Sequence, residues 1–92
     1  MSPSQLSSFD LLLQFSEESG ELIQAVSKHI RKERGTNPTP ATPEECRQHL
    51  IEEIADVSAV LDVMAEHWEI PPDELDLLVL MKKARWTERL SQ

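Results

Sequence analysis

Ninety-two residues suffice for one small domain, so residues 1–92 are expected to form a single unit with little room for a second core. Seventeen acidic and nine basic side chains give a formal net charge of −8, which disfavours binding to nucleic acids and anionic membranes but suits polyvalent cations. A single cysteine, Cys46, excludes an internal disulfide and is expected to act as a small hydrophobic residue. The absence of a roughly 20-residue apolar run and of a signal-peptide-like start predicts a soluble protein of the reducing cytoplasm.

The first predicted element is a long helix. With only two glycines, no tyrosine and few β-branched clusters, the chain is predicted to be all-α. This helix is expected to open near Ser7-Ser8 and to run to about Arg34, where basic side chains and then Gly35 suit a helix C-terminus. Gly20 lies inside it, and marks either tolerated helix weakening or the close approach of another backbone or a ligand. The Pro-rich residues 36–41 are expected to form an ordered linker or loop.

Two further helices follow the loop. The second begins with a capping box, in which Thr42 is the N-cap, Pro43 the first helical residue and Glu45 the third. It is expected to continue to about Trp68, since a Pro-Pro pair follows shortly after. The third helix is expected over residues 72–90. Together the three are expected to pack as an antiparallel helical bundle.

Acidic motifs occur on the first two helices, at residues 17–21 and 52–56. Advancing each residue by about 100° around the helix axis places Glu18 and Glu53 inside the apolar stripes of their helices. Glu21 and Asp56 fall at the edges of these stripes, three residues further on. The simplest alternative is that both motifs are coincidentally acidic surfaces. The positions of Glu18 and Glu53 favour a site that holds a cation.

Ionised carboxylates that are buried near one another require a positive charge between them. Neither packing face carries a lysine or arginine near these positions, whereas Mg²⁺ binds carboxylates together with substrate phosphates. A di-iron site would need Glu-x-x-His, and no glutamate of the chain has a histidine three residues later. His49 lies one turn before Glu53 and is either an outer contact of that carboxylate or an ordinary surface histidine.

Glu-Glu-x-x-Glu on one helix, followed by Glu-x-x-Asp on the next, resembles the MazG-like family of all-α nucleotide pyrophosphohydrolases. Residues 15–25 are similar to its first motif with flanking positions, and residues 35–43 and 50–57 to the loop and second motif of its small single-domain members. Residues 82–90 are similar to the basic C-terminal helix of the same group. The resemblance extends over roughly residues 9–90.

The resemblance implies a magnesium-dependent hydrolase. Glu18, Glu21, Glu53 and Asp56 would bind Mg²⁺, for which Mn²⁺ can substitute, and Glu17 would hold or orient the attacking water. The implied reaction cleaves a nucleoside triphosphate, ribo or deoxyribo, between its α- and β-phosphates to give a monophosphate and pyrophosphate. Phosphoryl transfer of this kind needs charge neutralisation and an in-line water more than a covalent nucleophile. Two other functions remain open, a phosphoribosyl-ATP pyrophosphohydrolase and a non-catalytic helical binding or regulatory module.

The third helix carries Lys82, Arg85 and Arg89 on one face, at i, i+3 and i+7. This stripe is a candidate phosphate-binding surface, although cations near a helix C-terminus also suit an ordinary solvated face. Trp68 and Trp86 are weak candidates for stacking on the base, since a tryptophan at helical spacing is more often part of a core.

The third helix is also apolar on nearly every side, and Leu77, Leu80 and Met81 cannot all be covered within three helices. We therefore expect a homo-oligomer, a dimer or a tetramer, whose helices complete four-helix bundles. The family resemblance implies the same arrangement.

Overall fold

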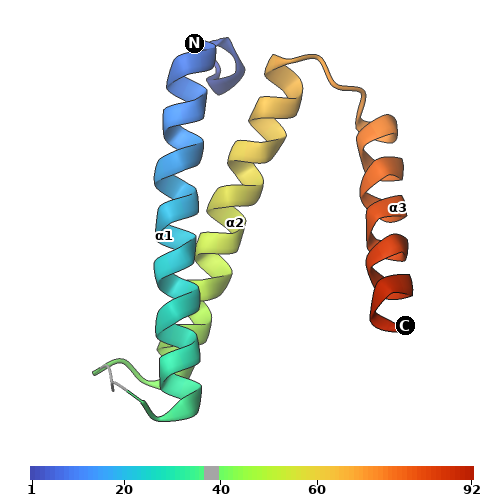
Figure 1. Cartoon of the computed structure of the whole chain (residues 1–92). Coiled ribbons are helices and arrows are strands. Elements are labelled where there is room, and N and C mark those ends of the chain that lie inside the picture. The colour runs from blue at the N-terminus through green and yellow to red at the C-terminus, as the bar shows by residue number, and fades with distance from the viewer. Residues whose placement is uncertain (37–39) are drawn as a thin grey trace.

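The computed structural model of the chain describes residues 1–36 and 40–92, which form helices and connecting loops. A short 3₁₀ turn, η1 (Pro3–Gln5), precedes three α-helices, α1 (Ser8–Arg34), α2 (Pro43–His67) and α3 (Pro72–Leu90) (Figure 1). The predicted all-α class and the predicted helix bounds are confirmed. Of the predicted loop at 36–41, residues 37–39 lie outside the described residues.

Local capping explains where α1 and α2 begin and end. The Ser7 hydroxyl accepts a hydrogen bond from the Asp10 amide at 3.0 Å, and α1 ends at Gly35, which adopts the left-handed conformation with φ of 66°. At the start of α2, the Glu45 amide donates to the Thr42 hydroxyl and the Thr42 amide donates to the Glu45 carboxylate, both at 3.1 Å. Donation to the Glu45 carboxylate by Thr42, first from its amide and then from its hydroxyl, holds the pKa of the Glu45 carboxyl below its ordinary value. The predicted capping box is therefore confirmed.

Helices α1 and α2 form an antiparallel hairpin (Figure 1). Its buried apolar residues are Leu11, Ala25 and Cys46. Cys46 behaves as the small buried hydrophobic residue that was predicted. Gly20 does not mark a close approach within the chain, because a methyl group placed on it would meet no heavy atom within 4 Å. Among the described helices, none combines the length and the apolar character needed to cross a bilayer.

The N-terminal turn η1 is tied to the far end of α2, a contact that was not predicted. The His67 Nδ1 atom lies 2.7 Å from the Ser4 carbonyl oxygen, and its Nε2 atom lies 3.0 Å from the Ser8 hydroxyl. The His67 ring also packs edge-on against Trp68. His67 thus links the C-terminal end of α2 to η1 and to the start of α1.

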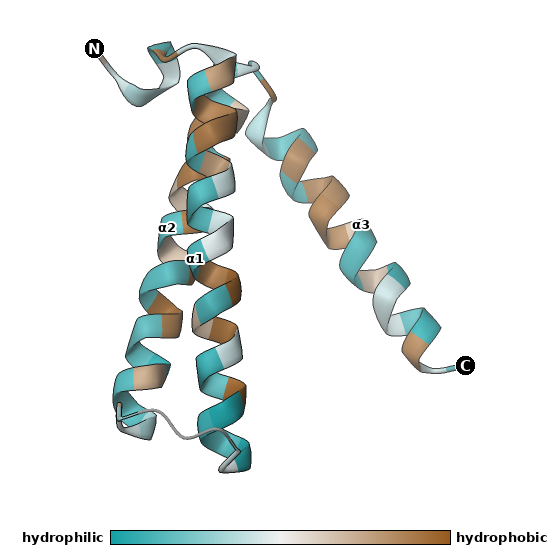
Figure 2. Ribbon diagram, turned by 60° about the vertical axis from the view of Figure 1, so that its left-hand side comes forward, coloured by the Kyte–Doolittle hydropathy of each residue, from teal (hydrophilic) through white to brown (hydrophobic). Residues whose placement is uncertain are grey.

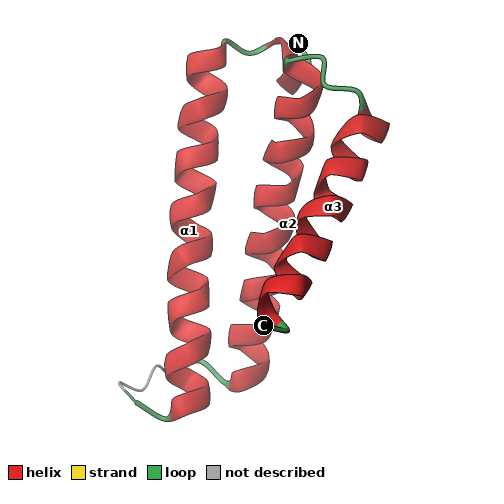
Figure 3. Cartoon of the chain, turned by 45° about the vertical axis from the view of Figure 1, so that its right-hand side comes forward, coloured by secondary structure: helices red, strands yellow, loops and turns green. Residues whose placement is uncertain are grey.

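Helix α3 stands apart from the hairpin in Figures 1 and 2, and its C-terminal part overlaps α2 only in the view of Figure 3, so the predicted three-helix bundle is not formed within one chain. Every residue of α3 is exposed. The segment between α2 and α3 turns the chain away from the axis of α2. Glu69 has a positive φ of 55°, and Pro71 and Pro72 prevent α2 from continuing. Figure 2 shows hydrophobic bands on the first half of α3 that lie away from α1. A helix that is apolar on many sides does not specify which side should pack on the hairpin.

Candidate metal centre

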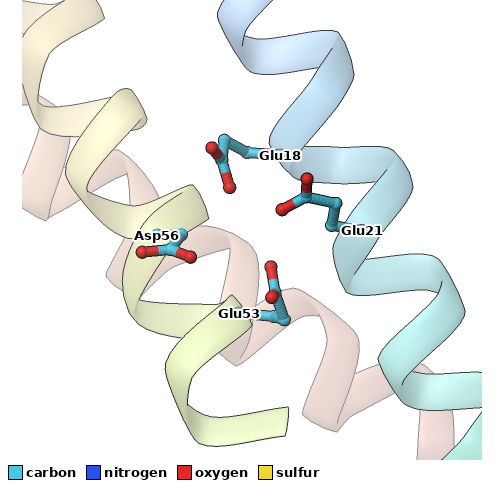
Figure 4. Close-up of side chains that lie close together, drawn as sticks. All are labelled: Glu18, Glu21, Glu53 and Asp56. Carbon is cyan, nitrogen blue, oxygen red and sulfur yellow. The ribbon is translucent and has the colours of Figure 1, made fainter. Parts of the chain in front are cut away.

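Four carboxylates meet between α1 and α2 (Figure 4). Helix α1 supplies Glu18 and Glu21, and α2 supplies Glu53 and Asp56. One oxygen from each of the four lies within 4.8 Å of the others. The spacing of three residues aims two side chains of one helix to the same side, and the antiparallel hairpin brings the two pairs face to face.

The cluster has an inner and an outer pair. Glu53 is only 8 % exposed and is buried on the packing face of α2, while Glu18 is partly buried on α1. Glu21 and Asp56 are exposed at the rim. Helix periodicity predicted the same arrangement, with Glu18 and Glu53 inside the apolar stripes and Glu21 and Asp56 at their edges. Glu17 is exposed on α1 and is not one of the four that meet.

Each inner carboxylate has one oxygen in contact with a side-chain nitrogen and leaves the other without a partner. The Gln14 Nε2 atom donates to Glu18 Oε1 at 2.9 Å, and His49 Nε2 lies 3.2 Å from Glu53 Oε1. Glu18 Oε2 and Glu53 Oε2 are buried and have no hydrogen-bond partner in the described part of the chain. Buried carboxylate oxygens without a partner are rare in folded proteins, and they require a proton, a water or a cation.

The electrostatics of the cluster are unfavourable without a positive charge. The pKa of the Glu18 carboxyl is raised above its ordinary value, first by loss of hydration and then by the negative charges of Glu21 and Asp56. The hydrogen bond from Gln14 opposes this rise in pKa but does not cancel it. The folded protein therefore keeps the carboxylates together at a cost in stability, as is usual for sites built for a ligand.

The donor set fits a hard divalent cation. All four groups are carboxylates that face a common space (Figure 4), one oxygen of each lies close enough to share one ion, and two buried oxygens of the set have no partner in the described part of the chain. Oxygen-only ligands suit Mg²⁺, Mn²⁺ or Ca²⁺, whereas zinc sites commonly include cysteine or histidine.

The other predicted site residues are not brought to the cluster. Lys82, Arg85 and Arg89 are exposed on α3, which stands apart from the hairpin (Figure 1). Trp86 lies on the same helix and is 62 % exposed, and Trp68 lies at the end of α2 against His67. Within one chain, the candidate metal centre is thus separate from the predicted phosphate-binding and base-stacking residues.

Gln14 was missed by the sequence analysis, although its spacing contained the signal. It precedes Glu18 by four residues, as His49 precedes Glu53, and such pairs share one helix face.

Comparison of the chain with protein-family models, with curated proteins and with solved structures gives no match.

Proposed function

We propose that this protein is a Mg²⁺-dependent nucleoside triphosphate pyrophosphohydrolase, which releases pyrophosphate from an NTP or dNTP by hydrolysis of the α–β phosphate bond. The observation that carries the proposal is the convergence of four carboxylates between α1 and α2, two of them with a buried oxygen that has no partner. The order of the two acidic motifs and their resemblance to MazG-like enzymes agree with it.

In this proposal Mg²⁺ is held by Glu18, Glu21, Glu53 and Asp56, and Mn²⁺ can replace it. The bound cation supplies neutralisation of phosphate charge during hydrolysis. Glu17 lies one residue before Glu18 and is exposed, so its carboxylate can accept a hydrogen bond from the attacking water. The water oxygen bonds to phosphorus, the bridging P–O bond breaks, the water releases a proton to solvent, and the nucleoside monophosphate and pyrophosphate leave.

Lys82, Arg85 and Arg89 are proposed to contact the triphosphate. Because α3 stands apart from the metal centre of its own chain, this role requires another arrangement of α3 or the α3 helix of a second copy. The cationic stripe would then complete a site to which the hairpin brings only negative charge. Trp68 and Trp86 remain weak candidates for contact with the base.

The proposed enzyme is a homo-oligomer, a dimer or a tetramer, and its surface area supports this. A globular monomer of this mass, 10.5 kDa, exposes about 5,400 Å². This chain exposes 7331 Å², which is about 1,900 Å² more. Obligate dimers bury about 1,000–2,500 Å² on each chain. The excess area is therefore of the size that a second copy would cover, and Leu77, Leu80 and Met81 of α3 are among its exposed apolar side chains.

The proposal is tested by measuring pyrophosphate release from a panel of ribo- and deoxyribonucleoside triphosphates and phosphoribosyl-ATP. Turnover is expected with Mg²⁺ or Mn²⁺ and should be abolished by EDTA. Full activity after thorough metal stripping would contradict the metal centre. Preference for phosphoribosyl-ATP would redirect the function to that substrate, and metal binding without turnover of any nucleotide would favour a binding module.

A further inference from the structure

The two inner carboxylates of the metal centre are held in the same way, although they belong to different helices. Gln14 lies one turn before Glu18 on α1, and His49 lies one turn before Glu53 on α2. In both pairs a side-chain nitrogen contacts Oε1, and in both the other oxygen is buried without a partner. We propose that Gln14 and His49 are positioning residues that each occupy one oxygen of an inner carboxylate, so that only the other oxygen is presented to the cation.

The chemistry of the contacts supports this assignment. An ionised carboxylate only accepts hydrogen bonds, so the Gln14 amide must donate to Glu18, and His49 must carry its proton on Nε2 to donate to Glu53. A hydrogen-bond donor on Oε1 fixes the rotation of the carboxylate group, and so directs Oε2 toward the cation. Donors of this kind behind metal ligands typically contribute 10–100-fold to metal affinity.

The burial of Glu53 makes the arrangement specific. Its side chain is 10 % exposed, its Oε2 atom is buried without a partner in the described part of the chain, and its carboxylate faces the space that it shares with Glu18 (Figure 4). His49 itself is 42 % exposed, so it is not a core residue whose place is set by apolar packing.

Occupying Oε1 also has a consequence for ion selectivity. Ca²⁺ accepts bidentate carboxylates and six to eight ligands, whereas Mg²⁺ requires a near-octahedral set at short distances. Carboxylates that offer one oxygen each therefore favour Mg²⁺ over Ca²⁺. This inference rests on the proposed metal centre, and adds to it the residues that set its affinity and its selectivity.

The test measures binding of MgCl₂ and of CaCl₂ to the metal-stripped full chain by isothermal titration calorimetry, without nucleotide. Gln14→Met and His49→Phe keep similar volumes but remove the donors. Each is expected to weaken Mg²⁺ binding about 10-fold or more, and to weaken Ca²⁺ binding less. His49→Gln places an amide donor at the same reach, as Gln14 does on α1, and should restore most of the Mg²⁺ affinity.

A matched control lies on α2. The Gln48 Nε2 atom donates to Glu52 Oε1 at 3.4 Å, also across four residues, but Glu52 does not belong to the metal centre. Gln48→Met should therefore leave both affinities unchanged. Circular dichroism in EDTA checks that each variant is folded, and failure of Gln14→Met or His49→Phe to fold leaves Gln14→His and His49→Gln to decide. Both of these retain a donor and must bind Mg²⁺ within a few-fold of wild type.

The outcomes separate this inference from the proposed function. Unchanged Mg²⁺ affinity in folded Gln14→Met and His49→Phe, or equal losses for Mg²⁺ and Ca²⁺, would overturn the positioning role even in an active enzyme. The same result follows if the wild-type protein does not bind Mg²⁺. Selective loss of Mg²⁺ binding in a protein that hydrolyses no nucleotide would instead overturn the proposed function and leave the positioning role standing.

Discussion

The α1/α2 hairpin and helix α3 both have regular helical backbones, yet they differ in how much of their apolar side chains they bury. The hairpin buries a narrow set of side chains, among them Leu11, Ala25 and Cys46, and places charged groups within the same face. Helix α3 has apolar side chains on many sides and buries none of them. Local sequence determines that each segment is a helix, but a defined apolar stripe is needed to determine its neighbour.

The two regions are also incomplete in complementary ways. Residues 1–71 contain thirteen acidic and five basic side chains, which leaves them with a net charge of −8, while residues 72–92 contain four of each. The hairpin lacks positive charge at its four carboxylates, and α3 lacks cover for its apolar side chains. Residues 82–90 carry all four basic groups of the C-terminal region, so the second half of α3 concentrates positive charge. We expect the two regions to be joined across copies of the chain.

The largest effect is expected for Leu80→Asp on α3, a residue that is 64 % exposed in the single chain. In a dimer each copy would lose about 2 kcal/mol of apolar burial and gain an unpaired charge, so association should weaken by at least about a thousandfold. Light scattering should show a monomer at micromolar concentration. Ser91→Asp adds the same charge beyond the end of α3, and should leave the oligomer intact. A wild-type protein that is itself a stable monomer would break the comparison.

In the hairpin, Glu53→Gln should lower kcat by roughly 100- to 1000-fold, because it removes a buried ligand of the proposed cation. The same substitution relieves repulsion between carboxylates, so in EDTA the melting temperature should stay the same or rise. Glu52→Gln, one residue earlier and exposed, is the matched control and should retain activity. A clear loss of thermal stability in EDTA for Glu53→Gln would identify Glu53 as structural.

On the basic stripe of α3, Lys82→Ala should reduce kcat/KM by roughly 1.5–3 kcal/mol, or about 10- to 100-fold, if Lys82 contacts a phosphate. Arg85→Ala should have the same effect or a smaller one. Lys83→Ala is the control, because Lys83 lies next to Lys82 but off the stripe. None of the three should shift the melting temperature much, since exposed charges contribute little to stability. If Lys82→Ala has the same kinetics as wild type, Lys82 does not contact a phosphate, and the proposed role of α3 is limited to oligomerisation.

The smallest effect concerns the pH dependence of stability without metal. The pKa of Glu18 is raised in the folded protein, so folding favours its protonated form. The stability associated with this group is fully present below its unfolded pKa, and is lost as the pH rises through the raised folded pKa. Lowering the pH from about 7 to about 5 in EDTA should therefore raise the melting temperature of wild type relative to that of Glu18→Gln. A constant difference between the two proteins over this range would show that the cluster exerts no electrostatic strain.

The sequence predicted what depends on local contacts. The helix bounds follow from Thr42 with Glu45, from Gly35 and from the Pro-Pro pair, each of which acts within one turn of its position. The meeting of the four carboxylates follows from helix periodicity together with a single antiparallel pairing. The position of α3 could not be predicted, since it depends on contacts between distant segments and on a helix that offers several apolar sides. Gln14 was missed because polar pairs four residues apart are common on exposed helices, and only burial of the acceptor gives such a pair its meaning.

The single thiol of the chain makes the hairpin observable in a different way. Cys46 is 4 % exposed, on α2 two turns before Glu53, and no other cysteine competes with it for a reagent. A thiol reagent reaches it when the structure around it opens locally, so the modification rate reports local opening at this end of the hairpin. A cation that bridges the two helices holds them together against this opening. The cation proposed for catalysis would therefore also slow local opening of the hairpin, and a lower rate of Cys46 modification in its presence would report this effect.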